Sequence, residues 1–346
     1  MPRIFLRLLV AAIVSGALVS AQEAEYTLKV DVPLVSVEVT VEDVEGNLAS
    51  SLPRDAFEVY EDGVRQDIRN FSPVSTPYNI FLLFDRSGST QHKWVFMEKA
   101  VAAFIASLRP QDRLAIATFD YKLESQLEWT GDRVKAARAL SKLINPKALG
   151  ETNLYDSVER VVRREFKKVP GRRVLVVLTD GRDTSVYREL AKSNRMLDSS
   201  EDRLFQKTFK AAREERIPVY FVAVNTDKNL EPSVQRDEYQ NLHILFPNTS
   251  MPQRYLAQVR TRMEQLAEVS GGRVFFPEGI EEIIPLYQQI GRELGMSYSL
   301  GYVSSNSLGY VSSNPAANGV FRRIEVRTRD SNLRITQSRS GYYERR

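Results

Sequence analysis

Short apolar runs alternate with amphipathic stretches through the middle of the chain. The apolar runs lie at residues 79–85, 113–120, 172–180 and 217–224. Runs of this length that are rich in Val, Ile, Leu and Phe are typical of parallel strands buried on both faces. The stretches between them have helical periodicity, as at residues 91–108. We therefore expect an α/β fold with a doubly wound, mostly parallel sheet of the Rossmann-like kind.

Both ends of the chain have a different, two-residue periodicity. Val35, Val37, Val39 and Val41 alternate with polar residues, and residues 321–343 show the same pattern near the C-terminus. Such alternation is typical of half-buried strands in antiparallel sheets. We expect the two ends to pack together as one small β-sandwich-like module, with the α/β domain inserted between them.

These patterns divide the chain into four parts. They are a signal peptide (1–21), an N-terminal β module (22–76), the α/β domain (77–295) and a C-terminal β segment (296–346) that packs with the N-terminal module. The polar segment 226–252 is expected to be an inserted loop. Two tandem copies of LGYVSSN, at 300–306 and 308–314, are interpreted as a local duplication that lengthens a hairpin.

The N-terminus has the composition of an export signal. Arg3 and Arg7 precede an apolar stretch at residues 8–19, and a small-residue site follows at residues 19–21. This order is typical of a secretory signal peptide, here expected to be cleaved before Gln22. An uncleaved anchor is the alternative, but the apolar stretch is shorter than the roughly 20 residues that a span needs. We predict a secreted or periplasmic protein with no transmembrane span in the mature chain.

The composition excludes several classes of site. The chain has no cysteine and only two histidines, which rules out disulfide frameworks, Cys nucleophiles, and thiolate or His-rich metal sites. The 48 basic residues nearly balance the 44 acidic ones, so charge does not indicate nucleic-acid binding. The sequence also lacks a P-loop, a dinucleotide glycine fingerprint, an HExxH motif and a nucleophile elbow. Enzymatic activity is therefore not expected.

Oxygen-bearing side chains follow the apolar runs. Asp85, Ser87 and Ser89 come at the end of one expected strand, Asp180 ends another, and Thr152 lies just before an expected helix. Because ligands of open parallel sheets sit beyond the carboxyl ends of the strands, these side chains can converge there. An all-oxygen donor set suits a hard cation, and Mg²⁺ fits best, with Mn²⁺ and Ca²⁺ as alternatives. Since the hydroxyls are neutral, a carboxylate from a partner can complete the shell.

The run DRSGS, the Thr of GETNLYD and the segment LTDG resemble the von Willebrand factor type A (VWA) domain with its metal-ion-dependent adhesion site. The resemblance covers about residues 78–294. The flanking segments, including F-x-V-x-E-D-G-x-x-Q and FRRIEV…GYY, resemble exported bacterial proteins called VWFA-related, described chiefly from Acidobacteria. The duplicated LGYVSSN departs from the single copy usual in that group. In the wider family two Ser and a Thr bind the metal, and two Asp act directly or through water. The resemblance implies these roles for Ser87, Ser89, Thr152, Asp85 and Asp180.

The favoured function is an exported, metal-dependent adhesion or protein-binding module that captures an Asp or Glu carboxylate of a protein or surface ligand. The alternatives are a structural envelope protein with an idle metal site and, less favoured, a metal-dependent hydrolase with His92 or Glu151 as general base.

His92 is otherwise expected to be a surface residue. Asp183 is expected to be a solvated loop acid. Arg86 either steers an acidic partner or pairs with a nearby acid.

Overall fold

The computed structural model describes eight stretches of the chain. They are residues 34–73, 76–87, 94–140, 152–186, 197–224, 251–278, 280–304 and 321–343. The predicted signal peptide, nearly all of the predicted loop at 226–252 and most of the tandem LGYVSSN segment lie outside the described residues.

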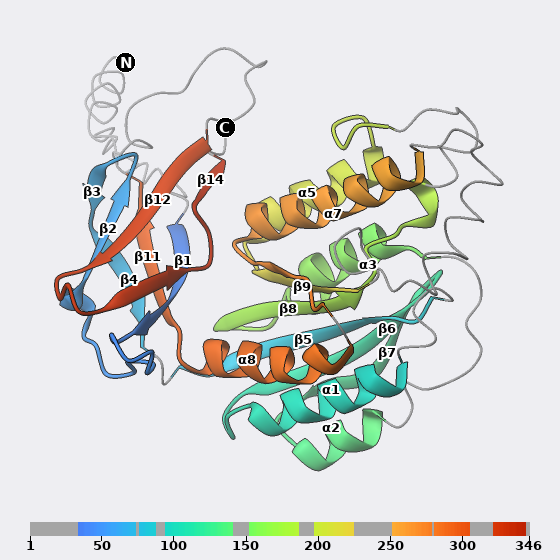
Figure 1. Cartoon of the computed structure of the whole chain (residues 1–346), viewed down its shortest axis with the longest axis horizontal. Helices are drawn as coiled ribbons and strands as arrows, with labels where there is room; N and C mark the ends of the chain where they lie inside the picture. The colour runs from blue at the N-terminus through green and yellow to red at the C-terminus, as the bar shows by residue number, and fades with distance from the viewer. Residues whose placement is uncertain are drawn as a thin grey trace, which may run out of the picture. The chain divides into compact units, whose positions relative to one another are not determined.

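A six-stranded sheet forms the centre of the α/β part, in the order β10-β9-β8-β5-β6-β7 (Figure 1). Its strands are β5 (Tyr78–Asp85), β6 (Arg113–Phe119), β7 (Leu123–Thr130), β8 (Arg172–Thr179), β9 (Val219–Ala223) and β10 (Val274–Phe275). All neighbouring pairs are parallel except β6 and β7. Every residue of β5 is buried, which explains why this segment is continuously apolar.

Helices cover both faces of this sheet (Figure 1). One face carries α1 (Trp94–Ser107), α2 (Arg133–Leu140) and α8 (Ile283–Gly295), and the other carries α3 (Leu154–Arg160), α5 (Arg203–Glu215) and α7 (Met251–Ser270). A π-helical turn, η3 (Val161–Glu165), extends α3, and a 3-10 helix, η4 (Ile280–Glu282), precedes α8. Within the described ranges, no helix combines the length and the apolar character needed to cross a membrane. The doubly wound α/β fold is confirmed.

Strands from both ends of the chain form two antiparallel sheets of four strands each. One has the order β13 (Arg334–Gln337), β1 (Leu34–Glu42), β11 (Tyr298–Val303), β4 (Ile68–Ser72), and the other β14 (Gly341–Tyr343), β12 (Phe321–Thr328), β2 (Phe57–Glu61), β3 (Val64–Gln66). A 3-10 helix, η1 (Arg54–Ala56), precedes β2. The alternating valines of β1 are at most 1% exposed and share one apolar core with residues of both sheets. The expected antiparallel structure from the chain ends is thus confirmed.

Two connections show how local sequence sets this topology. Asp62 and Gly63 join β2 to β3 with positive φ angles of 49° and 82°, the backbone that a two-residue hairpin turn requires. By contrast, the turn at residues 330–332 does not close a hairpin between its flanking strands. Instead β12 pairs with β2 and β14, whereas β13 pairs with β1, so the chain passes from one sheet to the other there.

Candidate metal centre

Asp85 and Asp180 lie at the carboxyl ends of two neighbouring central strands. Asp85 is the last residue of β5, and Asp180 directly follows β8, which pairs with β5 in parallel. The two residues are 1% and 0% exposed. The alternation of β and α segments therefore places both carboxylates at the sheet edge where α/β proteins bind ligands.

Hydrogen bonds hold both oxygens of Asp85. The backbone N–H of Ser87 donates to Oδ1 at 2.9 Å, and the Thr179 hydroxyl donates to Oδ2 at 2.6 Å. Burial first, and then the charge of Asp180, raise the pKa of Asp85 to about 7. Two carboxylates that repel each other in a buried site favour a cation or a retained proton between them.

The carboxylate of Asp180 has fewer hydrogen-bond donors around it than that of Asp85. Its Oδ1 accepts a 3.0 Å hydrogen bond from the backbone N–H of Arg182. Its Oδ2 is buried and accepts no hydrogen bond from the described residues, although Nη1 of Arg182 lies 3.3 Å away. A buried carboxylate oxygen with no hydrogen-bond donor is costly, and binding a cation would remove that cost.

The loop of Thr152 is tied to the loop that follows Asp180. The backbone N–H of Thr152 donates to the Thr184 hydroxyl at 2.7 Å, and the N–H of Thr184 donates to the Thr152 carbonyl at 2.8 Å. Thr152 is 7% exposed. These reciprocal bonds join the Thr152 loop to the polypeptide that carries Asp180.

The expectation that Asp183 is a solvated loop acid is wrong. Its side chain is buried and accepts hydrogen bonds from the N–H of Tyr155 at 3.0 Å and from the N–H and hydroxyl of Ser185. Tyr155 lies in the first turn of α3, where backbone donors have no partner within the helix. Asp183 therefore caps α3 from a distant loop, and its own burial raises its pKa.

Arg86 pairs with nearby acids. Its Nη2 lies 3.3 Å from Asp120 Oδ2 and 3.1 Å from Glu124 Oε2, and its backbone N–H donates to the Phe119 carbonyl. Of the two roles considered for Arg86, the structure supports the local ion pair. Ser89, His92 and Glu151 lie outside the described residues.

Gly181 allows the chain to turn directly after Asp180. Its φ is +78°, and a Cβ at this position would lie 2.6 Å from the Met263 side chain and 2.9 Å from Val259. Helix α7 thus packs against the backbone behind the candidate site. Only glycine meets both the conformational and the steric requirement.

The donor chemistry of these residues fits a divalent cation. Asp85, Ser87, Thr152 and Asp180 offer oxygen atoms only, and Asp180 Oδ2 is a buried acceptor without a hydrogen bond from the described residues. Sequence reasoning did not single out Thr179, Arg182 or Thr184. Thr179 directly precedes Asp180 and Arg182 follows it by two residues, and that closeness in sequence was the available signal; Thr184 gave none.

A match to a known protein family agrees with this fold. Residues 79–270 match the family model of the von Willebrand factor type A domain. Among solved structures, the chain is similar to proximal thread matrix protein 1 from the mussel byssus with a zinc-occupied MIDAS motif. That match has 13% identity, covers 65% of this chain and 47% of that one, and has a TM-score of 0.43.

Two bacterial structures are similar over more of the chain. The pilus adhesin SpaC from Lactobacillus rhamnosus GG matches with 11% identity over 75% of this chain and 34% of its own, with a TM-score of 0.47. A von Willebrand factor type A protein from Catenulispora acidiphila matches with 12% identity over 88% and 71%, with a TM-score of 0.43. The chain thus spans less than half of the mussel protein and about a third of the adhesin. Since the family model covers more than half of the sequence, this chain belongs to the von Willebrand factor type A domain family.

Proposed function

We propose that this chain is a metal-dependent protein-binding or adhesion module. In this proposal Asp85, Ser87, Ser89, Thr152 and Asp180 hold a divalent cation, and the cation captures an Asp or Glu carboxylate of a protein or surface ligand. Mg²⁺ is the preferred ion because the donor set consists of oxygens alone, and Mn²⁺ and Ca²⁺ remain alternatives. The protein acts by binding, without catalysis.

The observation that carries this proposal is the unbalanced charge of the buried acidic pair. Asp85 and Asp180 are almost fully buried, and Asp180 Oδ2 accepts no hydrogen bond from the described residues. Arg182, with Nη1 3.3 Å from that oxygen, is the basic group paired with Asp180. A divalent cation would neutralise both carboxylates, and with Arg182 beside them the centre would keep one net positive charge that attracts a third carboxylate.

The proposal includes export and a division of the chain. The N-terminal segment has the pattern of a signal peptide, which supports a secreted or periplasmic location. We assign residues 22–76 and 296–346 to the sandwich module and residues 77–295 to the VWA domain. The strand pairings of β1 with β11 and of β2 with β12 support this assignment. The flanking motifs further support membership of the VWFA-related bacterial group.

Calorimetric titration of the metal-stripped protein tests the cation site. We expect saturable binding of Mg²⁺ at one site, lost in Asp85→Ala. The matched control is Asp67→Ala, which removes a carboxylate that is 86% exposed and should leave binding unchanged. Equal binding by wild type and Asp85→Ala would contradict the proposal.

A second measurement tests partner capture. Immobilised protein should retain a partner in Mg²⁺ and release it in chelator, and Asp85→Ala should retain none in either condition. Esterification of the partner's carboxyl groups should abolish retention. Retention that is indifferent to chelator would favour the structural alternative, in which the metal site is idle.

A further inference from the structure

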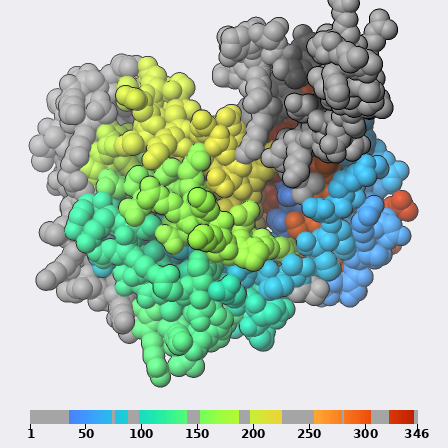
Figure 2. Space-filling view, turned by 180° about the vertical axis from the view of Figure 1, so that it is seen from behind, coloured from blue at the N-terminus to red at the C-terminus, as the bar shows by residue number. Residues whose placement is uncertain are grey.

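A polar cavity lies at the opposite end of the sheet from the candidate metal centre. It has a volume of about 230 Å³, opens to solvent, and is lined by strands β1, β4 and β11 on one side and by the amino-terminal ends of β8 and β9 on the other. Figure 2 shows a recess in the surface where green and yellow residues of the α/β part face blue and orange residues of the antiparallel sheets. Because Asp85 and Asp180 lie at the carboxyl ends of the strands, nothing in the proposed function uses this cavity.

The lining of this cavity is polar and positively charged. Its charged residues are Arg172, Arg173, Arg216 and Glu38, so basic groups outnumber acidic ones by three to one. Most of the other lining side chains are Ser, Thr or Asn, which can donate hydrogen bonds. A cavity of this size with several arginines and hydroxyls matches the chemistry of a bound oxyanion rather than that of an apolar ligand.

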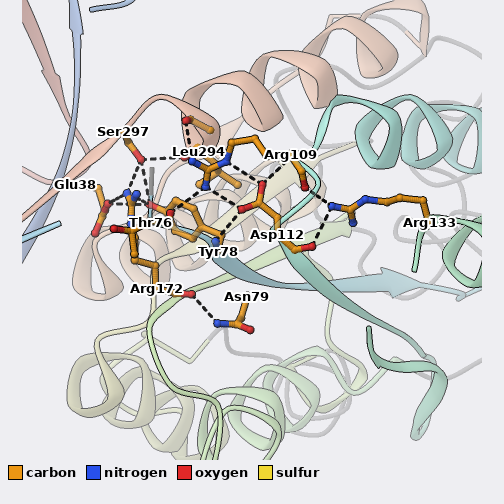
Figure 3. A network of polar contacts seen from close by, with 11 residues as sticks. Glu38, Thr76, Tyr78, Asn79, Arg109, Asp112, Arg133, Arg172, Leu294 and Ser297 are labelled. Carbon is orange, nitrogen blue, oxygen red and sulfur yellow. Dashed lines mark hydrogen bonds and ion pairs between the residues drawn. The ribbon is translucent and has the colours of Figure 1, made fainter. Parts of the chain in front are cut away.

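Arg172 is the buried centre of this lining. Its side chain is 5% exposed, and its Nη2 donates to the Glu38 carboxylate, to the Tyr78 hydroxyl at 2.5 Å and to the Ser297 hydroxyl at 2.7 Å (Figure 3). All these partners share one guanidinium nitrogen. Nε and Nη1 are buried and have no hydrogen-bond acceptor among the described residues.

Unused donors on a buried arginine are unusual because each one loses its hydration without replacement. The Glu38 carboxylate accepts from Nη2 and from the Tyr78 hydroxyl, and among the described residues no group accepts from the other two guanidinium nitrogens. An oxyanion in the cavity would offset the positive charge of this guanidinium, whose carbon lies 4.0 Å from the centroid of the Tyr78 ring.

A fourth arginine adds to the positive potential here. Arg339 donates to the carbonyl of Ser36, and its side chain packs against Gly271; both of these residues line the cavity. Its burial and the charge of Arg216 lower the pKa of Arg339 to about 10. The basic groups on this side of the molecule therefore repel one another, and an anionic ligand would reduce that repulsion.

We propose that this cavity binds a small oxyanion, namely a phosphate, sulfate or carboxylate group. Arg173 and Arg216 supply the charged contacts at its edge, and Arg172 adds buried positive charge. Lining serines complete the hydrogen bonds, apart from Ser270, whose hydroxyl donates to the Ala267 carbonyl. This site is independent of the metal centre. It allows the protein to hold an acidic small molecule or the acidic group of a larger ligand between its sandwich and its VWA domain.

Binding of three simple anions tests this proposal. Purified protein without added divalent cations is titrated by calorimetry with inorganic phosphate, sulfate and glucuronate, each at constant ionic strength set with sodium chloride. We expect saturable binding of at least one anion, and its affinity should fall about tenfold in Arg173→Gln and in Arg216→Gln, since each loses one charge-assisted contact. The anion that binds identifies the oxyanion group.

Arg69→Gln is the matched control, because Arg69 lies in β4 with its side chain 65% exposed and does not line the cavity. It should leave the affinity unchanged. Circular dichroism and the unfolding midpoint check that each variant is folded, and two separate edge variants keep the test informative if one of them is not. Absence of saturable binding of all three anions by the wild type would overturn the proposal. Equal affinity in the wild type, both edge variants and the control would overturn it as well.

Discussion

The hydroxyl of Thr179 donates a 2.6 Å hydrogen bond to Oδ2 of Asp85, from one central strand to its neighbour. The same hydroxyl accepts a 2.9 Å hydrogen bond from the backbone N–H of Gly181. With one lone pair occupied by that N–H, the hydroxyl proton is directed towards the carboxylate. Thr179 is thus a positioning residue for the candidate metal centre.

Removing this hydroxyl should weaken the proposed metal site. In Thr179→Val, Asp85 loses a hydrogen bond that lowers its pKa, so the carboxylate form becomes less favourable. We expect the Mg²⁺ affinity to fall about tenfold at neutral pH, the effect of losing one hydrogen bond to a charged group. Calorimetry at several pH values measures the change, which should shrink as the pH rises.

Thr118→Val is the control for this substitution. Thr118 is equally buried, at 1% exposure, but its hydroxyl accepts a hydrogen bond from Gln126 on the neighbouring strand β7. It should lower stability and leave the Mg²⁺ affinity unchanged. Identical affinities of the wild type and Thr179→Val would show that the Asp85 contact has no bearing on the site.

The stability of the metal-free protein should depend on pH through Asp85. Burial and the charge of Asp180 raise the pKa of Asp85 from 3.8 to about 7. Between these values the folded state holds a proton that the unfolded state has released, so the free energy of unfolding falls as the pH rises towards 7 and then levels off. Thermal unfolding in chelator at stepped pH measures this slope.

Asp85→Asn separates the contribution of this residue. The amide does not titrate, so the unfolding free energy should fall less steeply with pH. The pH dependence that comes from buried Asp183 should remain. A slope equal to that of the wild type would mean that Asp85 is ionised throughout this range.

Arg182 should contribute more to the free energy of unfolding in the metal-free protein than in the metal-bound protein. Arg182→Gln removes the guanidinium nitrogen that lies 3.3 Å from Asp180 Oδ2 and leaves the buried acidic pair without that countercharge. We expect a loss of about 1–3 kcal/mol in the free energy of unfolding in chelator, and a smaller loss at saturating Mg²⁺. Chemical denaturation in both conditions measures the two losses.

Arg260→Gln provides the comparison for Arg182. Arg260 pairs with Glu264 one helical turn away and is 24% exposed, so its loss should cost about 0.5 kcal/mol or less in either condition. Equal losses for Arg182→Gln with and without Mg²⁺ would argue that its ion pair and the metal site are unrelated.

Gly181→Ala should destabilise the fold more than Gly63→Ala. Both glycines have a positive φ, +78° and +82°, so both variants carry the strain of a left-handed alanine, about 1 kcal/mol. A Cβ at Gly63 meets no atom within 4 Å, whereas one at Gly181 lies 2.6 Å from Met263. Each variant's loss of unfolding free energy is measured relative to the wild type. The difference between the two losses isolates the cost of disturbing the packing of α7 against the site. Equal losses would mean that Met263 moves aside without cost.

Much of the fold could be predicted from the sequence because burial sets the spacing of apolar residues. The alternating valines of β1 and the continuous apolar run of β5 correspond to one buried face and two buried faces. The ends of the apolar runs of β5 and β8 also located Asp85 and Asp180. Local patterns therefore fixed which residues lie at the edge of the sheet.

Contacts between distant loops could not be predicted in this way. Asp183 looked like a loop acid because its partner, the N–H of Tyr155, lies 28 residues away. Thr179 looked like an ordinary strand residue, since a strand buried on both faces gives no sign of where each side chain points. Arg172 meets Glu38 across 134 residues, and no local pattern indicates such a pair.

The interleaving of the two chain ends in the sandwich imposes an order on biosynthesis. Strand β1 has β11 and β13 as its neighbours, and Glu38 lies opposite Ser299. A ribosome makes β1 long before it makes either neighbour, so the edges of this strand stay unpaired while more than 200 residues are added. The N–H and C=O groups along these edges are therefore open to pairing with other chains for most of synthesis. The last strand of the VWA sheet, β10, precedes β11 in the chain. All strands of the VWA sheet are therefore synthesised before β11, β12, β13 and β14 complete the sandwich.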